Sequence, residues 1–197
     1  MKKIDQNGNY LPFIGTTIIS FVKCQKLFKD IHEYISCHHH LFFKYYSLLP
    51  VESYHMTVKN HTVCSGSEKQ WYENFVADFA KYEQIKAKCN DYPGEITVNA
   101  VGCHFGGTFA LKVDVCENNV ENLRKEIVKL GSKREDNFKF HITFAYNYRP
   151  FKNDDIELCE ECKKISKYVL DLLLKEKIVL KKPQLCYFKD MTDFKPL

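Results

Sequence analysis

Two short segments, 54–58 and 140–144, each contain the sequence His-x-Thr within a run of β-branched and aromatic residues. Such runs favour a β-strand, on which side chains alternate between two faces and residues i and i+2 point the same way. Each histidine therefore shares a face with its threonine, and the apolar neighbours point to the opposite face, where a core can accept them. The four polar residues are His55, Thr57, His141 and Thr143. Two imidazoles with two adjacent hydroxyls supply the groups for acid–base chemistry on a phosphate ester.

Hydrolysis of a cyclic phosphodiester, such as the 2′,3′-cyclic phosphate at an RNA end, is a reaction that suits these groups. It needs a base that takes a proton from the attacking water and an acid that protonates the departing ribose oxygen. Histidine can do either near neutral pH, and two are needed because attack and departure occur on opposite sides of the phosphorus. A neighbouring hydroxyl can donate a hydrogen bond to a non-bridging oxygen. This scheme requires no metal, and we expect no cofactor.

Length and composition predict a folded globular protein, with 197 residues, 45% hydrophobic residues and 14% aromatic residues. The net charge of +4 suits an anionic ligand without demanding nucleic acid. No apolar run is long enough to span a membrane, and the first residues are polar rather than an apolar signal core. We therefore expect a monomer of the cytoplasm, or alternatively of the nucleus, that does not associate with membranes. The nine scattered cysteines are interpreted as small buried hydrophobes or unpaired thiols.

Hydrophobic periodicity and the positions of glycine and proline predict a chain of the α+β class. Strands are expected over 11–20, 54–58, 95–101, 108–115, 140–144 and 184–189. Helices are expected over 23–46, 68–88, 118–133 and 156–178, and turns or loops over 64–67, 91–94, 102–107 and 150–155. Each His-x-Thr strand follows one helix and precedes another, and the two are separated by close to half the chain. This spacing predicts a single domain, 1–197, of two similar lobes that each supply one motif strand to a shared groove.

The paired His-x-Thr strands resemble those of the 2H phosphoesterase superfamily, which includes bacterial RNA 2′,3′-cyclic phosphodiesterase/ligases and eukaryotic cyclic phosphodiesterases. Four blocks are similar to one branch of that superfamily and follow in the expected order: LPFIGTT (11–17), LLPVESYHMTV (48–58), FHITFAY (140–146) and LCYFKDMTDF (185–194). The resemblance implies a bilobal fold of two antiparallel-sheet lobes with helices outside and a central groove. It also implies that the histidine and threonine of both motifs are catalytic, and it does not imply the natural substrate.

Substrate contacts are expected from aromatic residues that can stack on a base and from cations that can hold a phosphate. Phe13 and Thr17 on the first strand, and Tyr148 and Arg149 just past the second motif strand, are candidates by position. The alternative for each is a place in the core or on the ordinary surface. Trp71 belongs to the apolar stripe of a helix and is assigned to the core.

Two other groups of residues have the composition of metal ligands. Residues 37–40 read Cys-His-His-His, and Cys159 and Cys162 form a C-x-x-C pair. Structural zinc needs four convergent ligands, whereas both groups fall within predicted helices and adjacent helical side chains diverge by about 100°. We therefore predict no metal site. His61 and His104 lie in or near loops, and the glycines of 102–107 lack the spacing of a nucleotide-binding fingerprint.

The sequence thus predicts an enzyme that hydrolyses a cyclic phosphodiester of a nucleotide or an RNA end by two-histidine acid–base catalysis. The alternative is a binding module that holds a phosphorylated ligand or an RNA end in the same groove without turnover. A third hypothesis, a zinc-stabilised interaction protein, predicts stoichiometric zinc.

Overall fold

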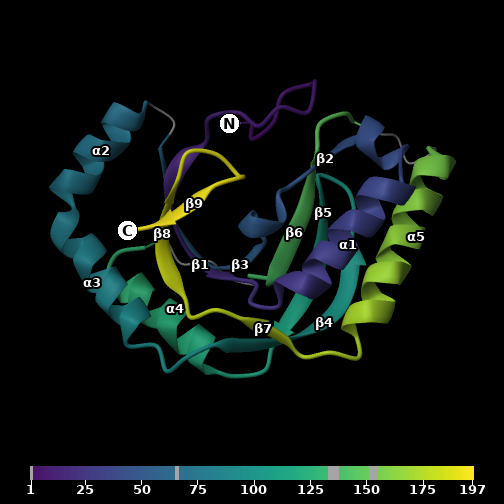
Figure 1. Cartoon of the computed structure of the whole chain (residues 1–197). Helices are drawn as coiled ribbons and strands as arrows, with labels where there is room; N and C mark the ends of the chain where they lie inside the picture. The colour runs from purple at the N-terminus through teal and green to yellow at the C-terminus, as the bar shows by residue number, and fades with distance from the viewer. Residues whose placement is uncertain (1, 65–66, 133–137, 151–154) are drawn as a thin grey trace.

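Strands alternate with helices along the chain in the computed structural model, which describes residues 2–64, 67–132, 138–150 and 155–197 (Figure 1). The strands are β1 (Ile14–Phe21), β2 (Tyr46–Leu48), β3 (His55–Cys64), β4 (Ile96–His104), β5 (Thr108–Val115), β6 (His141–Asn147), β7 (Ile178–Leu180), β8 (Gln184–Phe188) and β9 (Phe194–Pro196). The α-helices are α1 (Gln25–His38), α2 (Glu68–Ala77), α3 (Phe79–Asn90), α4 (Asn119–Lys129) and α5 (Ile156–Leu173). Short 3₁₀ helices, η1 (Phe42–Lys44) and η2 (Val51–Ser53), flank β2.

Within the described ranges, all the strands belong to one antiparallel sheet in the order β7-β4-β5-β6-β3-β1-β8-β9, with β2 paired to β6 outside this path. The sheet has two lobes, which meet where β3 pairs with β6. The first lobe comprises β3, β1, β8 and β9, and the second comprises β7, β4, β5, β6 and β2. The sheet curls so far that Val22, just after β1, forms a β-bridge with Leu180 of β7 at the opposite edge. The predicted α+β class and antiparallel sheet are confirmed, and the lobes share one continuous sheet.

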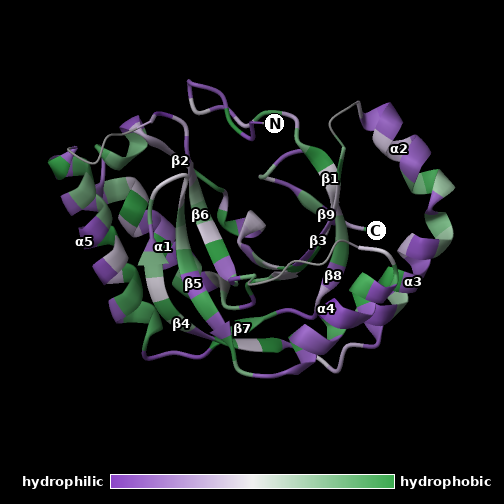
Figure 2. Ribbon diagram, turned by 180° about the vertical axis from the view of Figure 1, so that it is seen from behind, coloured by the Kyte–Doolittle hydropathy of each residue, from purple (hydrophilic) through white to green (hydrophobic). Residues whose placement is uncertain are grey.

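Helices cover the outer side of each lobe (Figure 1). Helices α2, α3 and α4 contact strands β1, β8 and β3 of the first lobe, and α5 contacts β4 of the second. Helix α1 buries Phe28, whose ring lies 6.1 Å from that of Phe144 on β6, so α1 packs against the second lobe although it follows β1. Leu158, Cys162, Ile165, Val169 and Leu173 of α5 recur at helical spacing and are buried, whereas hydrophilic residues form bands along its other face (Figure 2).

The two motif strands have one apolar face and one polar face, as strand alternation predicts. Met56 and Val58 on β3, and Ile142 and Phe144 on β6, are fully buried in the core between the sheet and the helices. The histidines and threonines of both motifs are only partly buried, because they point to the inner side of the curled sheet. The sheet itself therefore brings four polar side chains to one surface.

Several predicted helices are longer than the observed ones. The helix predicted over 23–46 ends at His38, because Tyr46–Leu48 pairs with β6 and adopts the strand conformation of its partner. The helix predicted over 156–178 ends at Leu173, and Ile178–Leu180 pairs with β4 as strand β7. The helix predicted over 68–88 is interrupted at Asp78 and forms α2 and α3.

Other boundaries differ by a few residues. Strand β4 continues to His104, so the loop predicted over 102–107 is shorter, and the short strand β9 was not predicted. Parts of the turn predicted over 64–67, of the loop over 150–155 and of the end of the helix over 118–133 lie outside the described residues. In the part of the chain that the structure describes, no helix has the length and apolar character needed to cross a membrane.

Candidate active site

The two His-x-Thr motifs meet at the junction of the lobes. Met56, the central residue of the first motif, lies directly opposite Ile142, the central residue of the second, in the antiparallel pairing of β3 with β6. The antiparallel direction places His55 on the same side of this pair as Thr143, and Thr57 on the same side as His141. Because the central residues point into the core, the other four side chains project together from the inner face of the sheet.

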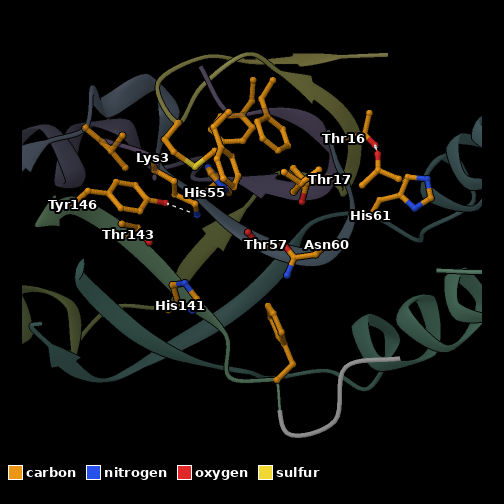
Figure 3. A pocket seen from close by; sticks show the side chains of 18 residues that line it. Lys3, Thr16, Thr17, His55, Thr57, Asn60, His61, His141, Thr143 and Tyr146 are labelled. Atoms are coloured by element: carbon orange, nitrogen blue, oxygen red, sulfur yellow. Dashed lines mark hydrogen bonds between the residues drawn. The ribbon is translucent and has the colours of Figure 1, made fainter. Parts of the chain in front are cut away.

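A cavity of about 230 Å³ lies over these side chains, between the two lobes. Figure 3 shows the two histidines and the two threonines on its wall. The lining also includes Lys3, Phe13, Thr16, Thr17, Leu49, Asn60, His61, Thr62, Val63, Phe138, Tyr146, Phe188, Met191 and Phe194. Among these described lining residues there is no carboxylate, whereas there is one lysine and there are three histidines. The cavity therefore suits an anionic ligand.

Both motif histidines are fixed in the same way. His55 Nδ1 lies 2.6 Å from the carbonyl oxygen of Ser53, and His141 Nδ1 lies 3.0 Å from the carbonyl oxygen of Lys139. In each case the partner is the backbone oxygen two residues earlier. A carbonyl oxygen can only accept, so Nδ1 carries the hydrogen and donates it, which leaves Nε2 of each ring for a ligand.

Aromatic rings partly cover the imidazole of His55. Its ring centroid is 4.4 Å from that of Phe194 and 6.2 Å from that of Phe21. Burial lowers the pKa of His55 from 6.5 to about 4, and the nearby His141 and Lys3 act in the same direction, against the hydrogen bond to Ser53. His55 is therefore neutral at physiological pH in the ligand-free protein.

The first-strand candidates Phe13 and Thr17 both line the cavity. The Phe13 ring stacks on that of Phe188 at 6.2 Å, and the Thr17 hydroxyl donates to the carbonyl oxygen of Lys59 at 3.2 Å. This hydrogen bond links β1, which carries Thr17, to β3, which carries the first motif.

The structure does not bring Tyr148 and Arg149 to this cavity. The Tyr148 hydroxyl donates to the carbonyl oxygen of Phe43 at 2.6 Å, and Tyr148 lines a different cavity that shares Lys3 and Tyr146 with the first. The Arg149 guanidinium lies over the Tyr148 ring at 5.4 Å. Trp71 is buried and packs against Tyr187 at 4.2 Å, which confirms its assignment to the core.

Lys3 is one of several lining residues that sequence reasoning missed, and it is the one lysine among the described lining residues. Its Nζ lies 3.3 Å from the Tyr146 hydroxyl and 5.1 Å from the centroids of both the Phe13 and Tyr146 rings (Figure 3). The lysine comes from a segment before β1 that has no periodicity, so no local pattern connects it with the motif strands.

A second, more open cavity adjoins the first and shares His141 and Phe138 with it. Lys112 lies on this side, directly opposite His141 in the pairing of β5 with β6. His104, which was expected in or near a loop, lies at the end of β4 and also lines it, with Nε2 3.2 Å from the Thr108 hydroxyl. His61, which was also expected in or near a loop, lies on β3 and lines the first cavity, and its Nδ1 lies 2.8 Å from the Ser132 hydroxyl.

The two groups with the composition of metal ligands lie at the end of α1 and on α5. Cys37 and His38 belong to α1, whereas His39 and His40 follow the helix that was predicted to contain them. The Tyr34 ring of α1 stacks on the Tyr168 ring of α5 at 3.5 Å, and His39 Nδ1 lies 3.9 Å from a carboxylate oxygen of Glu161. Cys162 is buried in the core, whereas Cys37 is exposed. Across the residues described, no three His, Cys, Asp or Glu side chains gather in a way that could hold a metal ion.

The curled antiparallel sheet, with a His-x-Thr strand in each lobe and one cavity over both, defines an α+β protein of the two-histidine type. Residues 3–91 match the family described as "2H-phosphodiest: Domain of unknown function (DUF1868)". "Uncharacterized protein 127L" of Invertebrate iridescent virus 6 is 31% identical over 180 residues, which cover 77% of this chain and 74% of that protein. The chain belongs to this 2H phosphoesterase family.

Solved structures share the fold. The crystal structure of the conserved protein of unknown function ATU0111 from Agrobacterium tumefaciens str. C58 matches with a TM-score of 0.72 and 18% identity, over 100% of this chain and 89% of that chain. A structure described as that of a phosphoesterase matches with a TM-score of 0.54 and 11% identity, over 95% of this chain and 96% of that one. At these identities the likeness concerns the fold alone.

Proposed function

We propose that this protein hydrolyses a cyclic phosphodiester, the 2′,3′-cyclic phosphate of a nucleotide or of an RNA end, by general acid–base catalysis with His55 and His141. The observation that carries the proposal is the matched pair of imidazoles. Each has Nδ1 committed to the carbonyl oxygen two residues earlier and Nε2 available to one cavity whose described lining has no carboxylate.

His55 is the proposed base, because its partly buried ring is neutral and its Nε2 carries a lone pair at physiological pH. Nε2 of His55 accepts a proton from water as the water oxygen forms a bond to phosphorus. The bond between phosphorus and one ribose oxygen breaks, and that oxygen takes the proton from Nε2 of His141. His55 then loses its proton to solvent and His141 regains one, which restores the starting state. The roles exchange when the reaction runs in reverse.

Thr57 and Thr143 are proposed to donate hydrogen bonds from their hydroxyls to the non-bridging oxygens. These oxygens gain negative charge as the water attacks, so a donor that is already in position stabilises the transition state more than the substrate. The anion itself counteracts the low pKa of His55, since a nearby negative charge favours the protonated imidazole that forms during the reaction. The scheme routes no step through a metal.

The test is an assay of all four nucleoside 2′,3′-cyclic phosphates with chelator present, read by separation of the monophosphate products. We expect turnover by the wild-type protein, and a loss of about 10²–10⁴ in rate for His55→Ala or His141→Ala. His40→Ala, at an exposed position after α1, is the matched control and should keep the wild-type rate. Binding of the cyclic phosphates without turnover would instead establish the alternative, a module that holds a phosphorylated ligand or RNA end.

A further inference from the structure

The segment 3–13, here called the N-terminal strap, connects the two lobes beside the cavity. At one end, the Phe13 amide donates to the carbonyl oxygen of Lys189, which follows β8 in the first lobe, at 2.7 Å. In the middle, the Tyr10 hydroxyl donates to the carbonyl oxygen of Ser47 on β2, in the second lobe, at 2.9 Å. Figure 1 shows the strap passing above the sheet from one lobe to the other. The strap is therefore a packed part of the fold.

The strap folds back on itself and holds Lys3 at a fixed place. Ile4 forms a β-bridge with Tyr10, and the Leu11 amide donates to the carbonyl oxygen of Lys3 at 3.0 Å. Ile4 is buried, and its neighbour Asp5 accepts hydrogen bonds from the backbone of the turn that follows. These contacts fix the backbone on both sides of Lys3, so its side chain extends into the cavity from a defined point.

The partners of the Lys3 ammonium are neutral: two aromatic rings, which attract it through cation–π contacts, and one phenol hydroxyl. The ammonium lies 5.1 Å from the centroids of the Phe13 and Tyr146 rings, and the Tyr146 hydroxyl accepts one hydrogen bond from it at 3.3 Å. Burial lowers the pKa of Lys3, and no carboxylate is present among the described residues that line the cavity. An ammonium has three N–H donors, so the Tyr146 hydroxyl leaves donors for a bound group. An anion in the cavity would supply both the missing negative charge and the acceptors.

We propose that Lys3 is a substrate-binding residue that holds a phosphate oxygen in the cavity, so that the N-terminal strap forms part of the site. The inference rests on the proposed function to the extent that a phosphate must enter this cavity. It adds the one lysine of the described lining to the residues that contact the phosphate. The N-terminal strap contains no His-x-Thr sequence, but it places Lys3 in the same cavity as the motif histidines.

The alternative is that Lys3 only anchors the strap through its contacts with the two aromatic rings. Thermal stability and phosphate affinity separate the two roles. An anchoring lysine would lower the melting temperature when it is replaced, without a specific effect on phosphate. A substrate-binding lysine would change the phosphate affinity, and relief of its desolvation would leave the melting temperature unchanged or raise it.

The experiment measures inorganic phosphate binding to the full chain by calorimetry at constant ionic strength, for the wild-type protein, Lys3→Met and Lys3→Arg. Lys2→Met is the matched control, because it removes the same charge from the adjacent, exposed residue. We expect Lys3→Met to weaken phosphate affinity about tenfold or more, since a charged hydrogen bond is lost. Lys3→Arg should retain most of the affinity, and Lys2→Met should stay within about twofold of wild type. Equal affinities for Lys3→Met and Lys2→Met, or no phosphate binding by the wild-type protein, would overturn the inference.

Hydrolysis of the cyclic phosphates separates this inference from the proposed function. If the wild-type protein binds phosphate through Lys3 but turns over no cyclic phosphate, the inference holds and the hydrolase proposal fails. If the wild-type protein turns over substrate and Lys3→Met leaves both kcat and KM unchanged, the hydrolase proposal holds and the inference fails. Tyr10→Phe, which removes the hydroxyl that attaches the strap to β2, should weaken phosphate binding less than Lys3→Met because the cation remains.

Discussion

The partly buried position of His55 against aromatic rings predicts an unusual pH dependence. If this histidine is the base, kcat/KM falls at low pH as the free protein binds a proton on its imidazole. Burial lowers the pKa of His55 from 6.5 to about 4, so the acid limb of the profile lies well below that of an exposed histidine. Replacement of Phe194, whose ring centroid lies 4.4 Å from that of His55, opens the imidazole to water and raises its pKa. We therefore expect Phe194→Ala to move the acid limb upward.

The size of the effect follows from the fraction of neutral His55. At about pH 5 a group with a pKa of about 4 is about 90% neutral, whereas a group with a pKa of 6.5 is about 3% neutral. Complete recovery of the ordinary pKa would thus lower kcat/KM at this pH, relative to its value at pH 7.5, by about 30-fold. Recovery of half the shift would lower it by about 2.5-fold. The expected ratio lies between these limits, because Phe21 still covers the other side of the ring.

The assay combines a pH profile of kcat/KM with a direct titration of the His55 side-chain nitrogens by NMR. The titration also tests the tautomer, since the contact with Ser53 predicts that Nδ1 carries the hydrogen. Phe75→Ala, on α2 and outside the cavity, controls for the loss of an aromatic ring and should leave the acid limb in place. A His55 that titrates near 6.5 in the wild-type protein, or an acid limb that Phe194→Ala does not move, would refute the assignment of a buried neutral base.

Three further predictions concern the hydroxyl of Thr57, the packing around Gly15 and the protonation of His61. Thr57→Val should lower kcat about 10²-fold by removing a donor to the phosphate, whereas Thr57→Ser should stay within a few-fold of wild type; equal rates for the two would exclude this role. Gly15→Ala should destabilise the protein by about 1–3 kcal/mol, because the new Cβ would lie 2.3 Å from the backbone oxygen of Thr62, whereas Gly102→Ala meets nothing within 4 Å and should be neutral in urea unfolding. Burial lowers the pKa of His61 to about 4 in the folded protein, so the unfolded chain binds more protons between pH 6.5 and 4. The free energy of unfolding therefore falls as the pH falls through this range. His61→Gln should make that fall shallower, and an unchanged slope would contradict the prediction.

The motif strands were predictable because the two signals that define them, the His-x-Thr sequence and the alternation of polar and apolar residues, are local. Alternation within five residues assigns His55 and Thr57 to one face and the apolar residues to the other, and the burial of Met56 and Val58 confirms this. The same reasoning could not supply the register, since β3 and β6 pair across a separation of close to half the chain. The placement of Met56 opposite Ile142 is a property of the folded sheet.

The residues and elements that sequence reasoning missed depend on partners distant in the chain. Tyr46–Leu48 and Ile178–Leu180 have no strand pattern of their own beyond three residues, and each becomes a strand by pairing with a longer one. Lys3 reaches the cavity because Ile4 and Tyr10 fold the strap back on itself. Tyr148 and Arg149 were chosen for their nearness in sequence to the second motif, but neither lines the cavity, and the Tyr148 hydroxyl is bonded to the backbone of Phe43.

The central claim is that the two motif histidines act as one acid–base unit, and a double-mutant cycle tests it most directly. The measurement is kcat for a nucleoside 2′,3′-cyclic phosphate, with chelator present, for the wild-type protein, His55→Ala, His141→Ala and the double variant. We predict that each single change lowers kcat by about 10²–10⁴ and that the double variant loses far less than the product of the two. Full activity in either single variant, or a double variant that loses the full product, would contradict the account.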